Sequence, residues 1–160
     1  VAHGPIVSPH GHTDPAWFAT DAPWANATTL LIQPDHYVYR MLYSQGIPLE
    51  DLGIGVPPDE LGDDRARAIW RTFAANWTLF RGTPSRMWFD HVFGEVFGLT
   101  ARFGPETADD FYDAINAALA TPAYRPRALM DRFNIEVIAT TESPLDDLAH
   151  HAKIRRDGWG

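Results

Sequence analysis

The chain has 160 residues, of which 45% are hydrophobic and 21% charged, a composition typical of a globular protein and not of a disordered one. Its formal net charge of −8 argues against binding to nucleic acid, whose phosphates would repel it. The sequence contains no cysteine, which excludes disulfides, thiolate nucleophiles and thiolate metal sites. Its apolar runs are far shorter than the ~20 residues of a membrane-spanning helix. We therefore expect a soluble protein with no membrane partner, located in the cytoplasm.

The N-terminal part predicts one strand, one long loop and one helix. Residues 5–12 hold a short apolar stretch that ends in a polar turn containing glycine, as at the end of a buried strand. Residues 13–34 are rich in Pro, Asp, Thr and Trp without a sustained period, which indicates an ordered surface loop. A helix is then expected from Asp35, a residue type that caps helices, to Gly46, a residue type that ends them.

The middle of the chain predicts four further helices. Their apolar residues recur at helical spacing, and Pro, Thr or Gly marks their ends. The predicted ranges are 66–77, 83–98, 105–122 and 126–134. Trp70, Trp77 and Trp88 fall on the apolar stripes, so we expect them in the core and assign them no role in stacking on a sugar.

The C-terminal part predicts a second strand and a last helix. Residues 135–139 are β-branched and apolar and follow a helix almost directly, as a buried strand would. Ser143 as the cap, followed by Pro144, predicts that the last helix begins there. Strand, long helical excursion, strand and helix together predict an α/β protein with a large, mainly helical insertion after its first strand.

His10 and His12 form the first candidate site. They are two residues apart at the end of the first predicted strand, so their side chains point to the same side. Strand ends are where β/α barrels hold their active sites, and two neutral imidazoles on one side supply half of a divalent metal site. Because the spacing alone is a weak signal, a solvated pair of loop histidines is the alternative interpretation. Placement on the first strand favours the metal.

The first turn of the helix that Asp35 caps is the second candidate site. Free N–H groups and the helix dipole favour an anion there. His36 and Arg40 are four residues apart and share a face, with Tyr37 beside them. In the functional interpretation Arg40 binds a carboxylate, while Tyr37 or His36 transfers a proton. In the alternative, Asp35 only caps the helix, Tyr37 packs and Arg40 is a solvated charge.

Four other polar residues are weaker candidates. His91 lies within a predicted helix, while His150 and His151 lie late in the last one, where structural or solvent-facing roles are expected. Glu142 follows the second predicted strand, at the active-site end of a barrel, and is retained as a candidate without an assigned role.

Short motifs along nearly the whole chain carry a resemblance to a known enzyme family. They include the His-x-His of residues 9–12 and the Asp-His-Tyr-x-x-Arg of residues 35–40. Further motifs are Val96-Phe97-Gly98-Leu99-Thr100, Thr107-Ala108, Arg127-Ala128-Leu129-Met130, Phe133-Asn134 and Thr140-Thr141-x-x-Pro144-x-Asp146-x-Leu148 with His150 or His151. In this order they resemble the motifs of the uronate isomerases, which belong to the amidohydrolase superfamily. Together they are far more specific than any one of them.

The resemblance implies the N-terminal part of a distorted (β/α)8 barrel, a TIM barrel of the metal-dependent hydrolase type. Residues 1–14 would form the first barrel strand and its metal-binding end, and residues 135–160 the second strand and its helix. Residues 15–134 would form the helical insertion, which includes the substrate-site segment 35–40. The family's remaining site residues would lie beyond Gly160. We therefore expect a fragment whose partner is the remainder of its own barrel, within a protein that can form homo-oligomers.

The implied activity interconverts D-glucuronate with D-fructuronate and D-galacturonate with D-tagaturonate. His10 and His12 would bind a divalent metal, expected to be zinc. Tyr37 and His36 would be catalytic, and Arg40 with His36 would bind the substrate. Tyr39 departs from the Trp of some members, and Glu142-Ser143 replaces a more usual Asp-Asp, which puts a role for Glu142 in doubt.

Two other functions remain open from the sequence. A metal-dependent hydrolase or deaminase of the same superfamily would use the same histidine pair to activate water. The segment 35–40 argues against this function, because attack by water requires no carboxylate clamp there. A non-catalytic helical interaction module built from residues 35–134 is the second alternative, and such a module need not contain a metal.

Overall fold

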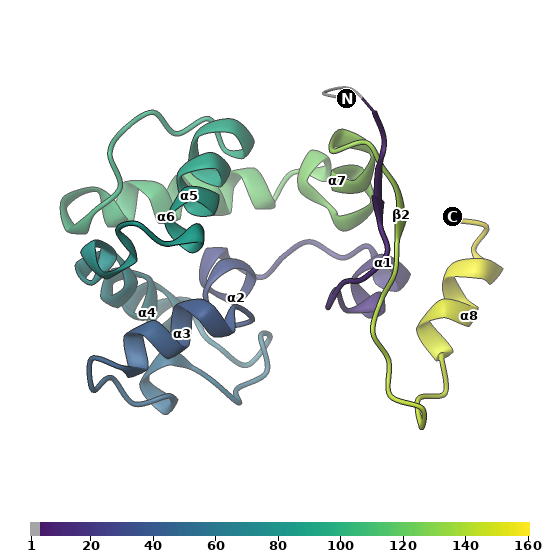
Figure 1. The fold of residues 1–160 in the computed structure, drawn as a ribbon, viewed down its shortest axis with the longest axis horizontal. Coiled ribbons are helices and arrows are strands. Elements are labelled where there is room, and N and C mark those ends of the chain that lie inside the picture. Colours follow the sequence, from purple (N-terminus) through teal and green to yellow (C-terminus); the bar gives the residue numbers. More distant parts are fainter. Residues whose placement is uncertain (1–3) are drawn as a thin grey trace. The chain divides into compact units, whose positions relative to one another are not determined.

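A computed structural model describes residues 4–160 as an α/β protein that is mostly helical (Figure 1). Its contacts divide the chain into two compact units. The first, which we call the strand unit, comprises Val1–Pro23 and Thr121–Gly160, and the second, the helical unit, comprises Trp24–Ala120. Residues 15–23 and 121–134, which were expected to be part of the insertion, therefore cluster with the two strands. No helix within residues 4–160 is long and apolar enough to cross a membrane.

The strand unit is built on two parallel strands that are distant in the sequence. Strand β1, Ile6–Ser8, pairs with β2, Ile135–Ile138, with an irregularity in register between Ile6 and Val7. Parallel strands need a long crossover connection, and here the whole helical unit lies within it. Three helices complete the unit, and their bounds are Pro15–Thr20 for α1, Pro126–Arg132 for α7 and Ala149–Arg156 for α8. Helix α1 packs against both α7 and α8.

The expectation that both strands are buried is wrong for the residues that the structure describes. Ile6, Val7 and Val137 are 49%, 58% and 46% exposed. A two-stranded sheet has two open edges and too few neighbours to cover its apolar side chains, even though β-branched residues favour the strand itself. The apolar composition of the two segments therefore predicted their strand conformation correctly. It did not predict their exposure within this chain.

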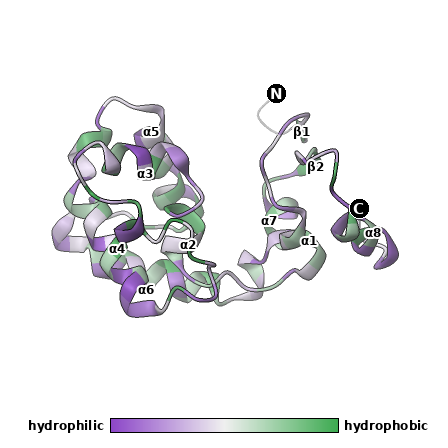
Figure 2. Cartoon of the chain, turned by 90° about the horizontal axis from the view of Figure 1, so that it is seen from below, coloured by the Kyte–Doolittle hydropathy of each residue, from purple (hydrophilic) through white to green (hydrophobic). Residues whose placement is uncertain are grey.

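The helical unit contains five α-helices, joined by short 3-10 turns and one π-helical turn at Val92–Val96. Their bounds are Ala27–Leu31 for α2, His36–Tyr43 for α3, Asp63–Ala75 for α4, Pro84–His91 for α5 and Ala108–Leu119 for α6. The sequence predicted four of the five, because Asp35, Thr83 and proline at first-turn positions mark their starts. Along α4 and α6, hydrophobic and hydrophilic residues alternate as an amphipathic helix requires (Figure 2).

Aromatic rings form the core of the helical unit. Trp70 and Phe73 on α4 are fully buried, and Phe93 and Phe103 pack with ring centroids 4.8 Å apart. The buried indole Nε1 of Trp70 donates to the carbonyl oxygen of Ala108 at 2.8 Å, so its one polar atom is satisfied. Trp70 and Trp77 thus confirm the expected core positions. Trp88 does not, because it is 46% exposed.

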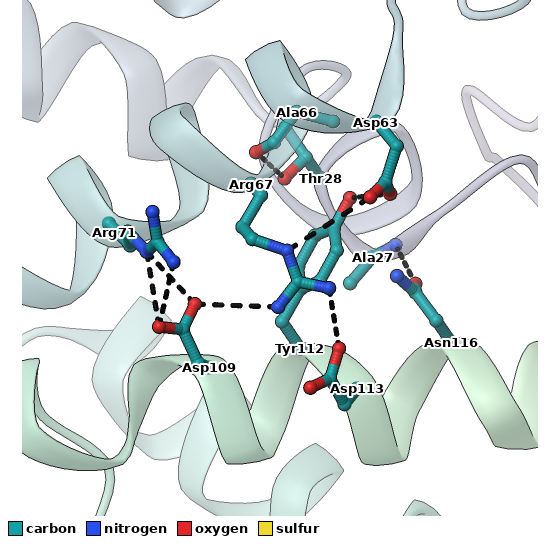
Figure 3. A network of polar contacts seen from close by, with 10 residues as sticks. All are labelled: Ala27, Thr28, Asp63, Ala66, Arg67, Arg71, Asp109, Tyr112, Asp113 and Asn116. Atoms are coloured by element: carbon teal, nitrogen blue, oxygen red, sulfur yellow. Dashed lines mark hydrogen bonds and ion pairs between the residues drawn. The ribbon is translucent and has the colours of Figure 1, made fainter.

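Helices α4 and α6 are also joined by a network of polar contacts (Figure 3). The Arg67 guanidinium contacts Asp113 at 2.5 Å and Asp109 at 3.4 Å, and its central carbon lies 4.4 Å from the centre of the Tyr112 ring. The Tyr112 hydroxyl donates to a carboxylate oxygen of Asp63 at 2.9 Å. Burial, followed by this hydrogen bond, raises the pKa of Tyr112 to about 12.

Two local predictions of secondary structure were wrong. Residues 13–34 are not one loop, since Asp14 caps α1 ahead of a proline at its first position, and Asn26 caps α2 in a capping box with Thr29. The last helix begins at Ala149 and not after Ser143. Ser143 and Asp146 do bond each other, but within a turn, and Leu148 has a left-handed backbone that separates this turn from α8.

Candidate active site

The two histidines that follow strand β1 face each other across a short distance. The Nε2 atoms of His10 and His12 are 3.2 Å apart, with their rings edge to face at 85°. Both side chains are exposed, so little packing holds the rings in place. The expectation that both imidazoles point to one side is confirmed. Two nitrogens that bind one tetrahedral zinc ion at about 2.0–2.1 Å lie about 3.3 Å apart, so the observed spacing fits a shared metal.

The backbone between the two histidines lies directly on the end of β2. The Thr141 hydroxyl donates to the carbonyl oxygen of Gly11 at 2.7 Å. A Cβ added at Gly11 would lie 3.1 Å from the carbonyl oxygen of Ala139, which is closer than an ordinary contact. Just before this point, the Ala139 amide donates to the Ser8 carbonyl oxygen at 2.9 Å. The two strand ends therefore stay in contact up to the histidine pair.

A cavity of about 420 Å³ lies beside His12, within the strand unit. Its walls come from the segment after β1, the segment after β2 and the start of α8. The polar residues among them include His12, Asp14, Thr141, Glu142, His150 and His151. Carboxylate, hydroxyl and imidazole groups dominate this wall, so the cavity suits a polar ligand.

His151 and Glu142 make contacts in this cavity that the sequence did not predict. The His151 Nε2 atom lies 3.0 Å from the Thr140 hydroxyl and 3.4 Å from a carboxylate oxygen of Glu142. His150 is exposed and His151 contacts Thr140 and Glu142, as expected of solvent-facing and structural residues, and both also line the cavity. Sequence position contained a usable signal, because parallel strands bring the segments after their carboxyl ends together. Glu142 keeps its place as a candidate.

The second candidate site is the start of α3 in the helical unit. A carboxylate oxygen of Asp35 accepts from the backbone N–H groups of Tyr37 and Val38, which confirms its role as the cap. The rings of His36 and Tyr37 lie 4.1 Å apart. Tyr37 is 66% exposed, so its ring packs against His36 at the surface and not in the core.

Arg40 lies one helical turn after His36, on the same face of α3. Its side chain is exposed, and it forms no ion pair with a carboxylate of residues 4–160. The guanidinium is therefore free to bind an anion. The structure thus brings His36, Tyr37 and Arg40 together on one turn, and separately His10 with His12.

Within residues 4–160, no group of three or more His, Asp or Glu side chains is arranged to hold a metal ion. The histidine pair fits a metal in ligand chemistry and spacing, but it supplies two ligands, while a catalytic zinc site commonly has three from the protein. The described residues therefore do not by themselves form a complete metal site.

Comparisons with known proteins identify the family. The glucuronate isomerase family matches residues 1–159. The chain belongs to this family. A uronate isomerase of Rhizorhabdus wittichii is 65% identical over 159 residues, which are 99% of this chain and 33% of the relative. A uronate isomerase of Phenylobacterium zucineum is 60% identical over 157 residues, 97% of this chain and 32% of the relative. The chain thus spans about a third of the length of these family members.

Solved structures of glucuronate and uronate isomerases share the fold. A crystal structure of glucuronate isomerase from Caulobacter crescentus matches with a TM-score of 0.92 at 57% identity, covering 100% of this chain and 33% of that one. A uronate isomerase from Thermotoga maritima, 24% identical, matches with a TM-score of 0.83 over 98% of this chain and 32% of that one. The second likeness shows the fold alone.

Proposed function

We propose that the protein containing this chain is a uronate isomerase that interconverts D-glucuronate with D-fructuronate and D-galacturonate with D-tagaturonate. The observation that carries the proposal is the 65% identity to a uronate isomerase over 99% of the chain. The histidine pair and the start of α3 support it, because both have the chemistry that the reaction requires. We further propose that the enzyme acts in the cytoplasm.

The proposed fold of the complete protein is a (β/α)8 barrel of the amidohydrolase superfamily, with the helical unit inserted after the first strand. The parallel pairing of β1 with β2 supports this fold, as does the long connection between them. The exposed apolar residues of both strands provide further support, since neighbouring strands and barrel layers would cover them.

The reaction moves hydrogen between two neighbouring carbons of the sugar. A proton leaves C2 and the C1 carbonyl oxygen gains one, which gives an enediol. The O2 hydroxyl then loses a proton while C1 gains one, and the keto sugar results. The reaction therefore needs a proton donor, a proton acceptor and groups that stabilise negative charge on the sugar oxygens.

In the proposal, residues of α3 provide the proton donor and bind the substrate. Arg40 binds the uronate carboxylate through charge-assisted hydrogen bonds, and its lack of an ion pair within residues 4–160 supports this role. The exposed Tyr37 hydroxyl donates a proton to a sugar oxygen, since a phenol is a poor base at neutral pH. His36, whose ring lies against that of Tyr37, hydrogen-bonds a substrate hydroxyl and holds the phenol in place.

In the proposal His10 and His12 hold a divalent metal, with zinc as the expected ion. A bound metal polarises the substrate oxygens and lowers the cost of negative charge on them. The spacing of 3.2 Å between the two Nε2 atoms supports this assignment.

The test is an assay of the full-length protein that carries these residues. Purified enzyme is incubated separately with D-glucuronate and D-galacturonate, and formation of the keto sugar is followed. Isomerisation of at least one uronate is expected. Hydrolysis of an amide or deamination of an amine, with no isomerisation of either sugar, would instead favour the hydrolase alternative.

A further inference from the structure

We propose that Thr141 is a positioning residue for the histidine pair. Its hydroxyl holds the backbone of Gly11, and this contact keeps the imidazoles of His10 and His12 directed at one point. The inference rests on the proposed function, in which that point is a metal ion. It adds a residue from the end of β2 to a site whose ligands come from the end of β1.

The rings of His10 and His12 have little support from neighbouring side chains. Both histidine side chains are exposed, so neighbouring side chains restrict their rings little. The orientation of each ring then depends mainly on the backbone from which it projects. A rotation of the peptide groups on either side of Gly11 would swing His12 away from His10, and the spacing of 3.2 Å between their Nε2 atoms would be lost.

Hydrogen bonds from both strand ends restrain the backbone of residues 10–12. The Ala139 amide bonds the Ser8 carbonyl oxygen at 2.9 Å, and beyond it the paired part of the two strands ends. The Ser8 hydroxyl then donates to the His10 carbonyl oxygen at 3.2 Å, which restrains the segment from its own strand. The 2.7 Å bond from Thr141 to the Gly11 carbonyl oxygen restrains it from the other strand.

Gly11 and Thr141 both suit the hydrogen bond that joins them. Glycine lets the histidine segment lie against β2, since a Cβ at position 11 would come within 3.1 Å of the Ala139 carbonyl oxygen. Thr140 and Thr141 follow the end of β2, and their hydroxyls have different partners. The Thr140 hydroxyl reaches His151 at 3.0 Å, and the Thr141 hydroxyl reaches Gly11. The two threonines thus anchor the end of β2 to α8 on one side and to the histidine segment on the other.

The experiment compares three substitutions in the full-length protein. Thr141→Val removes the hydroxyl at nearly constant shape, and Thr141→Ser keeps it. Thr20→Val is the matched control, because the Thr20 hydroxyl also bonds a backbone carbonyl oxygen of the strand unit, that of Ala16 at 2.8 Å, away from the histidines. The zinc dissociation constant is measured by competition with a chelator, and crystal structures of the metal-free proteins give the distance between the Nε2 atoms of His10 and His12.

Thr141→Val is expected to raise the zinc dissociation constant by about tenfold or more, as loss of a residue that orients metal ligands commonly does. Thr141→Ser should restore most of the affinity, and Thr20→Val should match the parent. If Thr141→Val proves unfolded by circular dichroism, Gly11→Ala serves instead, since it pushes the same segment away from β2 and should weaken zinc binding likewise.

Parent-like zinc affinity and an unchanged distance between the Nε2 atoms in Thr141→Val would overturn the positioning role. Failure of the metal assignment has a different signature, because the parent protein and His10→Ala would then bind zinc equally poorly. In that case the metal-free structures still decide the positioning role: separation of the two rings in Thr141→Val, but not in Thr20→Val, supports it.

Discussion

At the scale of single residues, substitution of His10 tests the metal assignment directly. A site with few protein ligands loses affinity when one of them is removed. His10→Ala in the full-length protein should lose most of its bound divalent metal, measured as zinc per chain by elemental analysis. His91→Ala is the control, since His91 is exposed at the end of α5. Unchanged stoichiometry and affinity in His10→Ala would remove His10 from the site.

Removal of the positive charge of Arg40 tests the proposed substrate site. A guanidinium that bonds the substrate carboxylate contributes about 1.5–3 kcal/mol, which corresponds to about 10- to 150-fold in affinity. Arg40→Met should therefore raise KM for glucuronate by a factor in this range, with a smaller fall in kcat. Arg81→Met is a matched control, because Arg81 is an exposed cation of the helical unit that forms no ion pair within residues 4–160. Unaltered kinetics in Arg40→Met would return Arg40 to the role of a solvated charge.

At the scale of elements, the packing of α4 on α6 makes stability depend on alkaline pH through Tyr112. Its pKa is raised from 10.0 to about 12 by burial and by the hydrogen bond to Asp63. Below pH 10 the phenol is neutral in both the folded and the unfolded chain, so its stabilisation is fully present. Between about pH 10 and 12 only the unfolded chain ionises it, and stability falls as pH rises.

The corresponding prediction uses Tyr112→Phe, which cannot ionise. Between pH 10 and 12 the parent should lose free energy of unfolding more steeply than this variant, by roughly 1 kcal/mol per pH unit. Urea unfolding followed by tryptophan fluorescence measures the difference, since Trp70 and Trp77 are buried in the same unit. Tyr43→Phe, at an exposed tyrosine of α3, should behave as the parent. Equal slopes for the parent and Tyr112→Phe would show that Tyr112 ionises as readily in the folded protein as in the unfolded chain.

At the scale of the whole molecule, the 160 residues by themselves should not isomerise uronates, even with added zinc. Two strands cannot close a barrel, and their apolar side chains remain exposed. Two histidines are also fewer ligands than a stable catalytic zinc site commonly has. The assay incubates the isolated chain with glucuronate or galacturonate and compares keto-sugar formation with that of the full-length protein. Comparable turnover would show that the remaining two thirds of the relatives' length are dispensable for catalysis.

Local chemistry was enough to predict much of this chain. Asp35 at a cap, proline in first turns and apolar residues at helical spacing act within a few residues, so the sequence alone predicted that α3 to α7 exist. The end of α5 was not predicted, because the helix expected to reach residue 98 ends at His91 and continues as a π-helical turn. The sequence also predicted that His10 and His12 point to one side, although both lie just after β1 and not within it. The family motifs added the site residues of α3, whose roles stay predictions.

Only the tertiary structure decided between conformations that the local sequence allows equally well, and only it decided which distant segments meet. Ser143 and Asp146 bond each other equally well in a helix cap or in a turn, and the left-handed Leu148 settles it as a turn. The cavity beside His12 and the Thr141–Gly11 bond also required the tertiary structure. Their partners are more than a hundred residues apart in sequence. Sequence position indicates that the segments after two parallel strands meet, but not which of their groups bond, because the packing of β1 against β2 sets those contacts.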